Sequence, residues 1–465
     1  MSTPVPPHPT SPPEAWEPLL RLVRLASRPL ERFLRIQAAS GILLLVAAAV
    51  ALAWANSPWA ESYTRLWHTP VGLRLGAFSF ERSLEWVVND GLMVIFFFVV
   101  GMEIRREVHH GELSEWRRAA LPVAAALGGM IAPALLYLAF AGAPETRSGW
   151  GVPMATDIAF ALGILTLLGK RVPPSLRVLL LALAVIDDLG AIVVIALFYS
   201  SGVSLAGLLT AALGFVGVLA MQRLGVRAKW AYVVPALVAW AGIYAAGIHP
   251  TIAGVIVGLM TPVRAWLGPQ GLLVDVRQEL ETLGQQHSHE DLSRVLRHVD
   301  VARREALSPA ESLIEALHPW VAFGIMPVFA LANAGVQLSG GTLGASAWSV
   351  ATAVAVGLVL GKPVGVLLAI GATLRLRIGT LPAGLTARHL VVLGLVAGVG
   401  FTMALFIAQL AFTDASLLAG AKLGVLAASA CAAMLTLVLG RLLLPPVTPG
   451  NAARSADEAE SSTEL

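Results

Sequence analysis

The chain has 465 residues, of which 57% are hydrophobic and 13% are charged. Soluble domains carry about 25% charged residues, so this composition excludes a water-soluble globular protein. The 44 glycines and 28 prolines, many inside apolar stretches, are typical of membrane helices. The net charge of +3 and the scattered basic residues argue against nucleic-acid binding. The single cysteine, Cys431, excludes an intramolecular disulfide, and its apolar context predicts a small buried residue.

Apolar runs near the length that crosses a bilayer predict the helices. Two of the runs are shorter than the others and begin with a proline. In chain order, the twelve candidate spans are 39–56, 86–104, 119–141, 153–169, 175–199, 203–222, 229–247, 250–262, 318–338, 347–373, 388–412 and 415–440. We therefore expect an all-α polytopic membrane protein with about twelve transmembrane helices in one domain, 36–444.

The lysines and arginines test this topology, because cytoplasmic loops hold their excess. With the N-terminus inside, 26 of the 32 basic residues fall in cytoplasmic segments, four fall outside, and Lys362 and Lys422 lie within spans. We therefore expect both termini in the cytoplasm. The first span follows about 38 residues with five arginines, too long a leader for a cleaved signal peptide, so we expect it to remain as a helix.

The segments outside the spans are expected to be polar and largely unstructured. The tails 1–35 and 445–465 are predicted to be disordered, the first because it contains eight prolines. The loop 263–317 is the one substantial soluble part, and its amphipathic run predicts a solvated helix on the cytoplasmic face, with a regulatory element as the alternative. A metal site at its histidines is a weaker alternative; these are His287, His289 and His298.

Several ionisable residues lie inside the apolar spans, among them Asp90, Asp157, Asp187, Asp188 and Lys362. Placing a charged side chain at the bilayer centre costs between about 3 and more than 10 kcal/mol. Such a residue therefore persists only when it is paired with another charge, hydrated or needed for function. Neighbouring helix residues point about 100° apart, so Asp187 and Asp188 can border one cavity but cannot share one partner. One can meet a cation and the other Lys362, and the two titrate as a coupled unit. A purely structural ion pair is the alternative, but it leaves negative charge unmatched.

These groups suit the exchange of a small hard cation for protons, because such cations prefer carboxylate, hydroxyl and carbonyl oxygens. Thr156 adds a hydroxyl beside Asp157. The short span that holds Asp157 predicts a half-helix whose positive N-terminal end that carboxylate offsets. The glycine-broken span 388–412 is its natural counterpart, since inverted-repeat transporters place paired interrupted helices at mid-membrane. No cofactor is expected.

Six stretches carry a family resemblance. They are NDGLMVIFFFVVGMEIRRE, MATDIAFALG, AVIDDLGAIVVIALFY, ANAGV, LGKPVGV and GVGFTMALFIA. In order and across about residues 40–440, the chain resembles the NhaA family of bacterial Na⁺/H⁺ antiporters. The resemblance implies exchange of Na⁺ or Li⁺ for H⁺ across the inner (plasma) membrane, and a fold with inverted repeats.

The resemblance also implies roles for the membrane charges. A cytoplasm-facing funnel would end at the aspartate pair, with Asp188 the direct cation ligand and Asp187 sharing protons and an ion pair with Lys362. Asp157 and Lys362 would offset the ends of two crossed, unwound helices. Asp90 resembles the family's additional membrane carboxylate and is given a secondary role.

Regulation and assembly are further implications of the resemblance. Glu103 and Glu107 resemble the family's pH-sensing cluster; a solvated helix end rich in arginine is the alternative. The segment 57–85 resembles an external β-hairpin, which implies a homodimer. The chain departs from the family pattern at two places that bear on pH regulation. The loop 263–317 is unusually long, and Glu315 represents the acidic residue that the family places just before HPW.

Other function classes fit the residues less well. A nucleotide-driven pump needs a phosphate loop, but GLVLGK has three residues between its glycines and is followed by Pro363. An intramembrane hydrolase with paired aspartates is an alternative, although the chain has no HExxH or GxSxG motif. A cation channel is another, against which the Lys362 counter-charge argues. For the antiporter, two carboxylates predict two protons per monovalent cation and hence electrogenic exchange.

Overall fold

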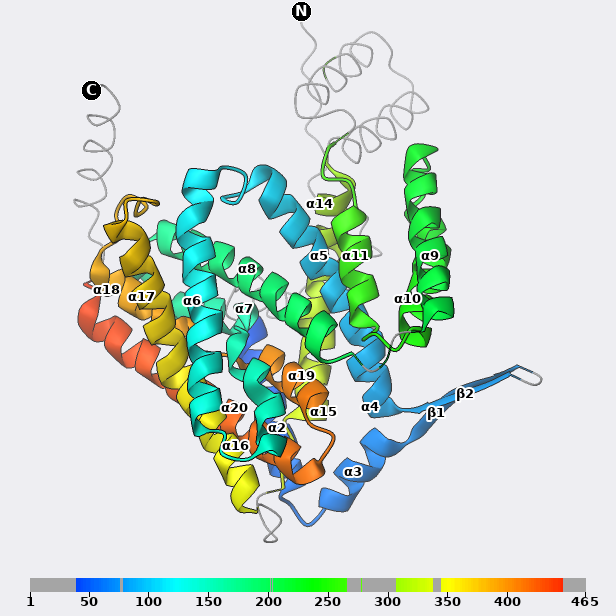
Figure 1. Cartoon of the computed structure of the whole chain (residues 1–465), viewed down its shortest axis with the longest axis horizontal. Coiled ribbons are helices and arrows are strands. Elements are labelled where there is room, and N and C mark those ends of the chain that lie inside the picture. Colours follow the sequence, from blue (N-terminus) through cyan, green and yellow to red (C-terminus); the bar gives the residue numbers. More distant parts are fainter. Residues whose placement is uncertain are drawn as a thin grey trace, which may run out of the picture.

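The computed structural model describes residues 39–75, 78–200, 202, 204–265, 277, 307–337 and 344–445. The predictions for the two tails, for most of the loop 263–317 and for its three histidines lie outside the described residues. Within the described part, helices form a bundle from which a two-stranded hairpin projects to one side (Figure 1). Helices suit a membrane because they satisfy backbone polar groups within the segment, where lipid offers no partner.

Seven helical segments of the described chain are long and apolar enough to cross a membrane. Three of them contain a π-helical turn. The seven are α4–η2–α5 (Leu84–Trp86, Val87–Leu92, Met93–His110), α6 (Trp116–Phe140), α8 (Pro174–Phe198), α9 (Leu205–Arg223), α14–η6–α15 (Pro309–Trp320, Val321–Ile325, Met326–Asn333), α16–η7–α17 (Ala345–Val356, Gly357–Gly361, Lys362–Arg375) and α20 (Ala415–Leu443).

Bent helix pairs raise the count of spans in the described chain to as many as ten. They are α2–α3 (Ala39–Ala55, Ala60–His68), η3–α7 (Pro144–Met154, Ile158–Leu167) and α18–α19 (Ala387–Ala397, Phe401–Ala411). The remaining helices are shorter: α10 (Val233–Ala245), α11 (Thr251–Met260), η4 (Gly169–Arg171) and η5 (Lys229–Tyr232). Each predicted apolar run therefore coincides with a helix or a bent pair, but the structure supports seven to ten spans, and twelve are not confirmed.

Three details of the sequence prediction are wrong. The helix predicted from 318 begins at Pro309, because Ser308 and Glu311 form a reciprocal capping box before it. The end of the loop 263–317 is therefore helical. The first part of the segment 57–85, predicted as a hairpin, forms the helix α3, whose sequence is too polar to appear among apolar runs. Cys431 is exposed on α20 rather than buried.

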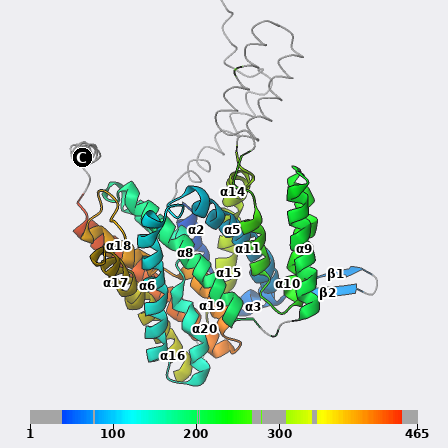
Figure 2. The same ribbon diagram turned by 45° about the horizontal axis from the view of Figure 1, so that its top comes forward.

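The hairpin consists of β1 (Pro70–Leu75) and β2 (Phe78–Ser83), which pair antiparallel from Pro70↔Ser83 to Leu75↔Phe78. Its base is tied to α10, because Arg82 donates a hydrogen bond of 2.7 Å to the hydroxyl of Tyr244. Figure 2 shows α9 and α10 side by side at this edge of the bundle, next to the hairpin.

Glycines allow two helix contacts that position charged residues. A Cβ at Gly365 on α17 would lie 2.1 Å from the carbonyl oxygen of Gly128 on α6, and a Cβ at Gly101 on α5 would lie 2.5 Å from that of Val255 on α11. Any larger residue would force each helix pair apart. The first contact fixes α17, which begins with Lys362, and the second fixes α5, which carries Glu103.

Candidate ion-binding site

The breaks in two bent helix pairs touch each other at the centre of the bundle. The chain turns by 51° between η3 and α7 and by 43° between α18 and α19. The backbone N–H of Asp157 donates to the carbonyl of Val399 at 2.8 Å, and the hydroxyl of Thr156 donates to that of Ala397 at 3.0 Å. Each break thus supplies partners for the polar groups that the other releases, which a membrane interior requires.

The carboxylate of Asp157 caps two helices at once. One oxygen accepts a 3.0 Å bond from the N–H of Phe160 and so caps α7. The other accepts from the N–H of Thr402 at 3.2 Å and from the Thr402 hydroxyl, in the first turn of α19. Helix N-termini carry partial positive charge, so this buried anion is stabilised by both ends.

Lys362 lies between a carboxylate and a helix C-terminus. Its ammonium is 2.6 Å from Oδ2 of Asp187 and also donates to the carbonyl of Met154, the last residue of η3. Both charged side chains are fully buried. Gly129 on α6 lies beside the lysine. A Cβ there would be in ordinary contact with Cε of Lys362 at 3.8 Å but would lie only 2.9 Å from Cγ2 of Val366. The π-turn η7, which ends at Gly361, directly precedes the lysine.

Asp188 carries the charge that these contacts leave unmatched. It is buried on α8 next to Asp187, and Glu103, Lys362 and Asp157 are the other charged groups that act on it. Within the described part of the chain, Oδ1 of Asp188 and Oδ1 of Asp187 find no hydrogen-bond partner. A buried carboxylate needs a proton, a counter-ion or hydrogen bonds, so this pair is suited to take up a proton or a cation.

Thr156 belongs to the same cluster, because it lies beside the carboxylate of Asp187. Its hydroxyl hydrogen is directed to Ala397, which leaves its lone pairs as acceptors. Among the residues that the structure describes, no group of three or more His, Cys, Asp and Glu is placed to hold a metal ion.

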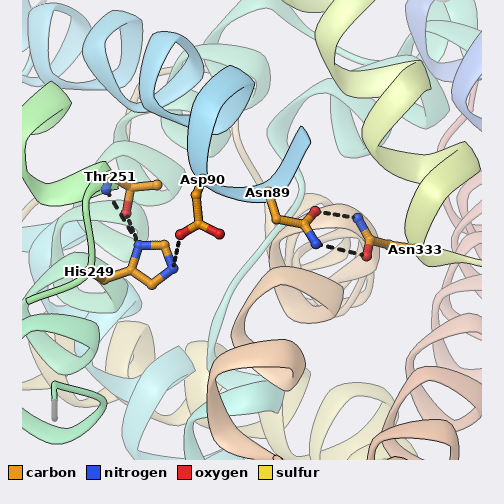
Figure 3. A network of polar contacts seen from close by, with 5 residues as sticks. All are labelled: Asn89, Asp90, His249, Thr251 and Asn333. Carbon is orange, nitrogen blue, oxygen red and sulfur yellow. Dashed lines mark hydrogen bonds and ion pairs between the residues drawn. The ribbon is translucent and has the colours of Figure 1, made fainter. Parts of the chain in front are cut away.

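The remaining predicted acids do not join the cluster equally. Glu103 is half-buried on α5 and is among the charges that act on Asp188. Glu107, one turn further along, accepts a 2.9 Å bond from the N–H of Glu112 at the end of the helix. Asp90 lies in η2, some 20 Å from Glu103 along the helix. Its Oδ1 is 3.6 Å from Nε2 of His249 (Figure 3).

Comparison with known proteins gives the family. Residues 31–439 match the family described as Na⁺/H⁺ antiporter 1. The chain belongs to this family. It is 72% identical to the "Na(+)/H(+) antiporter NhaA 2" of Myxococcus xanthus over 100% of both chains. It is 56% identical to the protein of that name from Sorangium cellulosum, over 98% of each. The resemblance to the NhaA family is thereby confirmed.

The solved structure of the sodium proton antiporter MjNhaP1 from Methanocaldococcus jannaschii is also similar. It matches with a TM-score of 0.47 and 13% identity, over 91% of this chain and 96% of that one.

Sequence reasoning missed several residues of this buried cluster. Thr402 lies within the GVGFTMALFIA stretch, but the sequence does not indicate that its side chain hydrogen-bonds to Asp157. Met154 contributes a backbone carbonyl, which leaves no signal in the sequence. Ser429 accepts a 3.0 Å bond from the N–H of Phe401 at the start of α19, and nothing distinguishes it from other helical serines. The glycine beside Lys362 was likewise one of 44.

Proposed function

We propose that the chain is a secondary transporter that exchanges Na⁺ for H⁺ across the bacterial inner membrane, with Li⁺ as a second cargo. Membership of the antiporter family supports this, as do relatives named Na(+)/H(+) antiporter at 72% and 56% identity over nearly their whole length. A chain with seven to ten apolar spans among its described residues is suited to it. The proposal makes the protein a transporter without a cofactor, not an enzyme.

The observation that carries the proposal is the charge imbalance of the buried cluster. The cluster holds three buried aspartates and one buried lysine, and two of the aspartates retain a carboxylate oxygen that is unpartnered among the described residues. In our proposal Asp188 binds the cation directly. Asp187 exchanges its lysine partner for a proton or shares the cation, and Thr156 adds its hydroxyl. Asp157 continues to cap the N-termini of α7 and α19 and so keeps the breaks in the two bent helix pairs in contact.

Exchange requires that the site meet one face of the membrane at a time. We infer that η3–α7 and α18–α19 are crossed, discontinuous helices of two inverted repeats, whose movement against the other helices turns the site from one face to the other. In this proposal the domain extends over 36–444 in twelve spans, with both tails in the cytoplasm. The charge of Glu103 on Asp188 offers a route for pH regulation from the cytoplasmic side, with Glu107 at the helix end beside it. The projecting hairpin, placed outside, would join two copies as a homodimer.

The function is tested in everted membrane vesicles that have been energised to hold a pH gradient. Adding Na⁺ or Li⁺ should dissipate the gradient in vesicles with the wild-type chain, and Asp188→Asn should abolish the response. Asp414→Asn is the matched control, because this exposed aspartate caps α20 and its amide oxygen preserves the cap. A wild-type chain that leaves the gradient unchanged with every alkali cation would refute the proposal. A channel would instead give flux that does not saturate and needs no counter-ion.

Electrogenic exchange is a separate part of the proposal. Two protons against one monovalent cation move a net charge, which couples to the membrane potential by about 2.3 kcal/mol per 100 mV. In proteoliposomes, a potassium diffusion potential set with valinomycin should accelerate or slow exchange according to its sign. Rates that are independent of that potential would contradict the two-proton stoichiometry while leaving exchange itself intact.

A further inference from the structure

Three amide side chains meet at the end of the bundle where the span Leu84–His110 begins. Asn333, at the end of α15, donates to Oδ1 of Asn89 at 2.8 Å and to the carbonyl of Phe329 at 3.0 Å. Its own oxygen accepts from Gln409 and, at 3.5 Å, from Asn89. Figure 3 shows Asn89 and Asn333 facing each other across the gap between η2 and α15. We call Asn89, Asn333 and Gln409 the amide clamp.

The clamp is a closed hydrogen-bond network. Asn333 is fully buried and uses both of its N–H hydrogens and both lone pairs of its oxygen. Asn89 and Gln409, its partners, are half-buried. A buried side chain whose hydrogen bonds are all made favours one relative position of the elements that supply its partners. These elements have different neighbours: η2 continues into α5, which packs on α11, α15 packs on α2, and α19 packs on η3 and α20. The clamp therefore ties an interrupted helix of the acidic site to other parts of the bundle.

A single face of α19 connects the clamp to the acidic cluster. Thr402 and Gln409 are seven residues apart, so they lie on the same face about 10 Å from each other. Thr402 binds Asp157, and Gln409 binds Asn333. Between them Phe406 is buried, with its ring centroid 5.2 Å from that of Phe97 and 6.2 Å from that of Phe329.

Along this face of α19, the contact with Asp157 is therefore followed by the aromatic layer around Phe406 and then by the amide clamp. Beyond the clamp, Glu85 lies 3.5 Å from the Gln409 amide and provides a carboxylate. It is half-buried, at the start of the span, and its charge acts on the buried Lys422 of α20. A carboxylate at the outer end of this row is suited to attract a cation towards it.

We propose that the amide clamp is the gate that closes the ion route between the acidic cluster and the membrane face remote from Glu103. This inference rests on the proposed exchange function. The clamp holds in the state described here and separates when the site turns to that face, and water then solvates the freed amides. Neutral amides suit such a gate because a protein–protein hydrogen bond exchanged for water costs little net free energy, whereas separated buried ions would cost far more.

Weakening the clamp should shift the population towards the state open at its own face. The Michaelis constant for Na⁺ added at that face should fall, and the constant for Na⁺ added at the opposite face should rise, because apparent affinity scales with the fraction of competent protein. For Asn333→Ala and Gln409→Leu we expect the ratio of the two constants to change by about fivefold to tenfold, as the loss of one or two hydrogen bonds permits. Side-specific exchange in oriented proteoliposomes measures both constants.

Asn56→Ala is the matched control. The amide of Asn56 donates to the carbonyl of Val336 at 2.7 Å, three residues after Asn333, and to that of Leu52 at 2.8 Å. It ties down the same end of the molecule without contacting the clamp, so both Michaelis constants should stay within about twofold of the wild type. Clamp variants whose two constants rise together, or do not change, would overturn the gate.

A cross-link keeps the inference testable if the clamp variants fold poorly. In a Cys431→Ser background, Asn89→Cys and Asn333→Cys are joined by a short reversible thiol cross-linker. Exchange should stop and return on reduction, while Na⁺ should still raise the thermal midpoint of the cross-linked protein. Undiminished exchange across the cross-link would refute the gate. If the Cys431→Ser chain without the two introduced cysteines shows no Na⁺-driven exchange, the proposed function itself is refuted.

Discussion

The ammonium of Lys362 lies 2.6 Å from Oδ2 of Asp187, and both side chains are fully buried. The next residue, Asp188, has a carboxylate oxygen that finds no partner among the described residues. Because adjacent helical positions point in different directions, one aspartate is neutralised by the lysine and its neighbour is not. The contact therefore gives the two aspartates different roles. Asp187 is the structural partner of α17, and Asp188 is left to bind a proton or a cation.

Lys362→Met should destabilise the protein by about 3 to 5 kcal/mol, because it leaves the Asp187 charge buried without a partner. The double variant Lys362→Met/Asp187→Leu should recover most of that loss, since no charge is then stranded. Both should lack normal exchange. Thermal unfolding in detergent, followed by tryptophan fluorescence, measures the stability.

The loss in Lys362→Met should also shrink as the pH falls, because a protonated Asp187 needs no counter-charge. A single variant as stable as the wild type at alkaline pH would show that the ion pair does not hold α8 to α17.

Asp157→Ala removes the acceptor that caps both α7 and α19. Several N–H and O–H donors would then be buried without partners, so we expect a loss of about 2 to 4 kcal/mol. Asp157→Asn keeps an oxygen for one of the two helices and should lose roughly half as much. Equal stabilities of the two variants would contradict the double-capping role. Unfolding midpoints at one pH and detergent concentration make the comparison.

Gly365→Ala and Gly371→Ala are a matched pair on α17. A Cβ at Gly365 would lie 2.1 Å from the carbonyl oxygen of Gly128, so α6 and α17 must separate, at a cost of at least about 1 to 3 kcal/mol. A Cβ at Gly371 meets no described atom within 4 Å, and alanine there should stabilise the helix by up to about 1 kcal/mol. Since Lys362 is one turn from Gly365, exchange should fall in the first variant alone. Transport and unfolding assays on both variants make the comparison. Equal stability and exchange in the two variants would contradict the close contact at Gly365.

Ser308→Ala should cost about 1 kcal/mol, because the side chain of Ser308 accepts the N–H of Glu311 and the Glu311 carboxylate accepts that of Ser308. Ser308→Thr retains the hydroxyl and should stay close to the wild type. Proteolysis after Arg303 or Arg304 would report the effect, with faster cleavage expected in the alanine variant. Identical cleavage rates in both variants would show that the capping box does not stabilise the start of α14.

Much of the fold follows from local properties that a sequence displays. The apolar runs coincide with helices because backbone hydrogen bonds in lipid must be satisfied within each segment. The start of α14 was misplaced because its first turns are amphipathic, and α3 was missed because it is polar. The number of spans depends on whether bent pairs are single crossings, which hydropathy cannot settle.

The sequence by itself determined the class, the order of the helices and the few charges that lipid would not tolerate without a use. Asp157, Asp187, Asp188 and Lys362 stand out for that reason alone. The tertiary structure decided their partners, since Lys362 meets Asp187 across 175 residues and Thr402 meets Asp157 across 245. Helix formation is local and leaves a pattern, whereas a hydrogen bond between distant helices depends on packing to within a fraction of an ångström. The amide clamp belongs to this second kind, because neutral side chains carry no membrane penalty large enough to single them out beforehand.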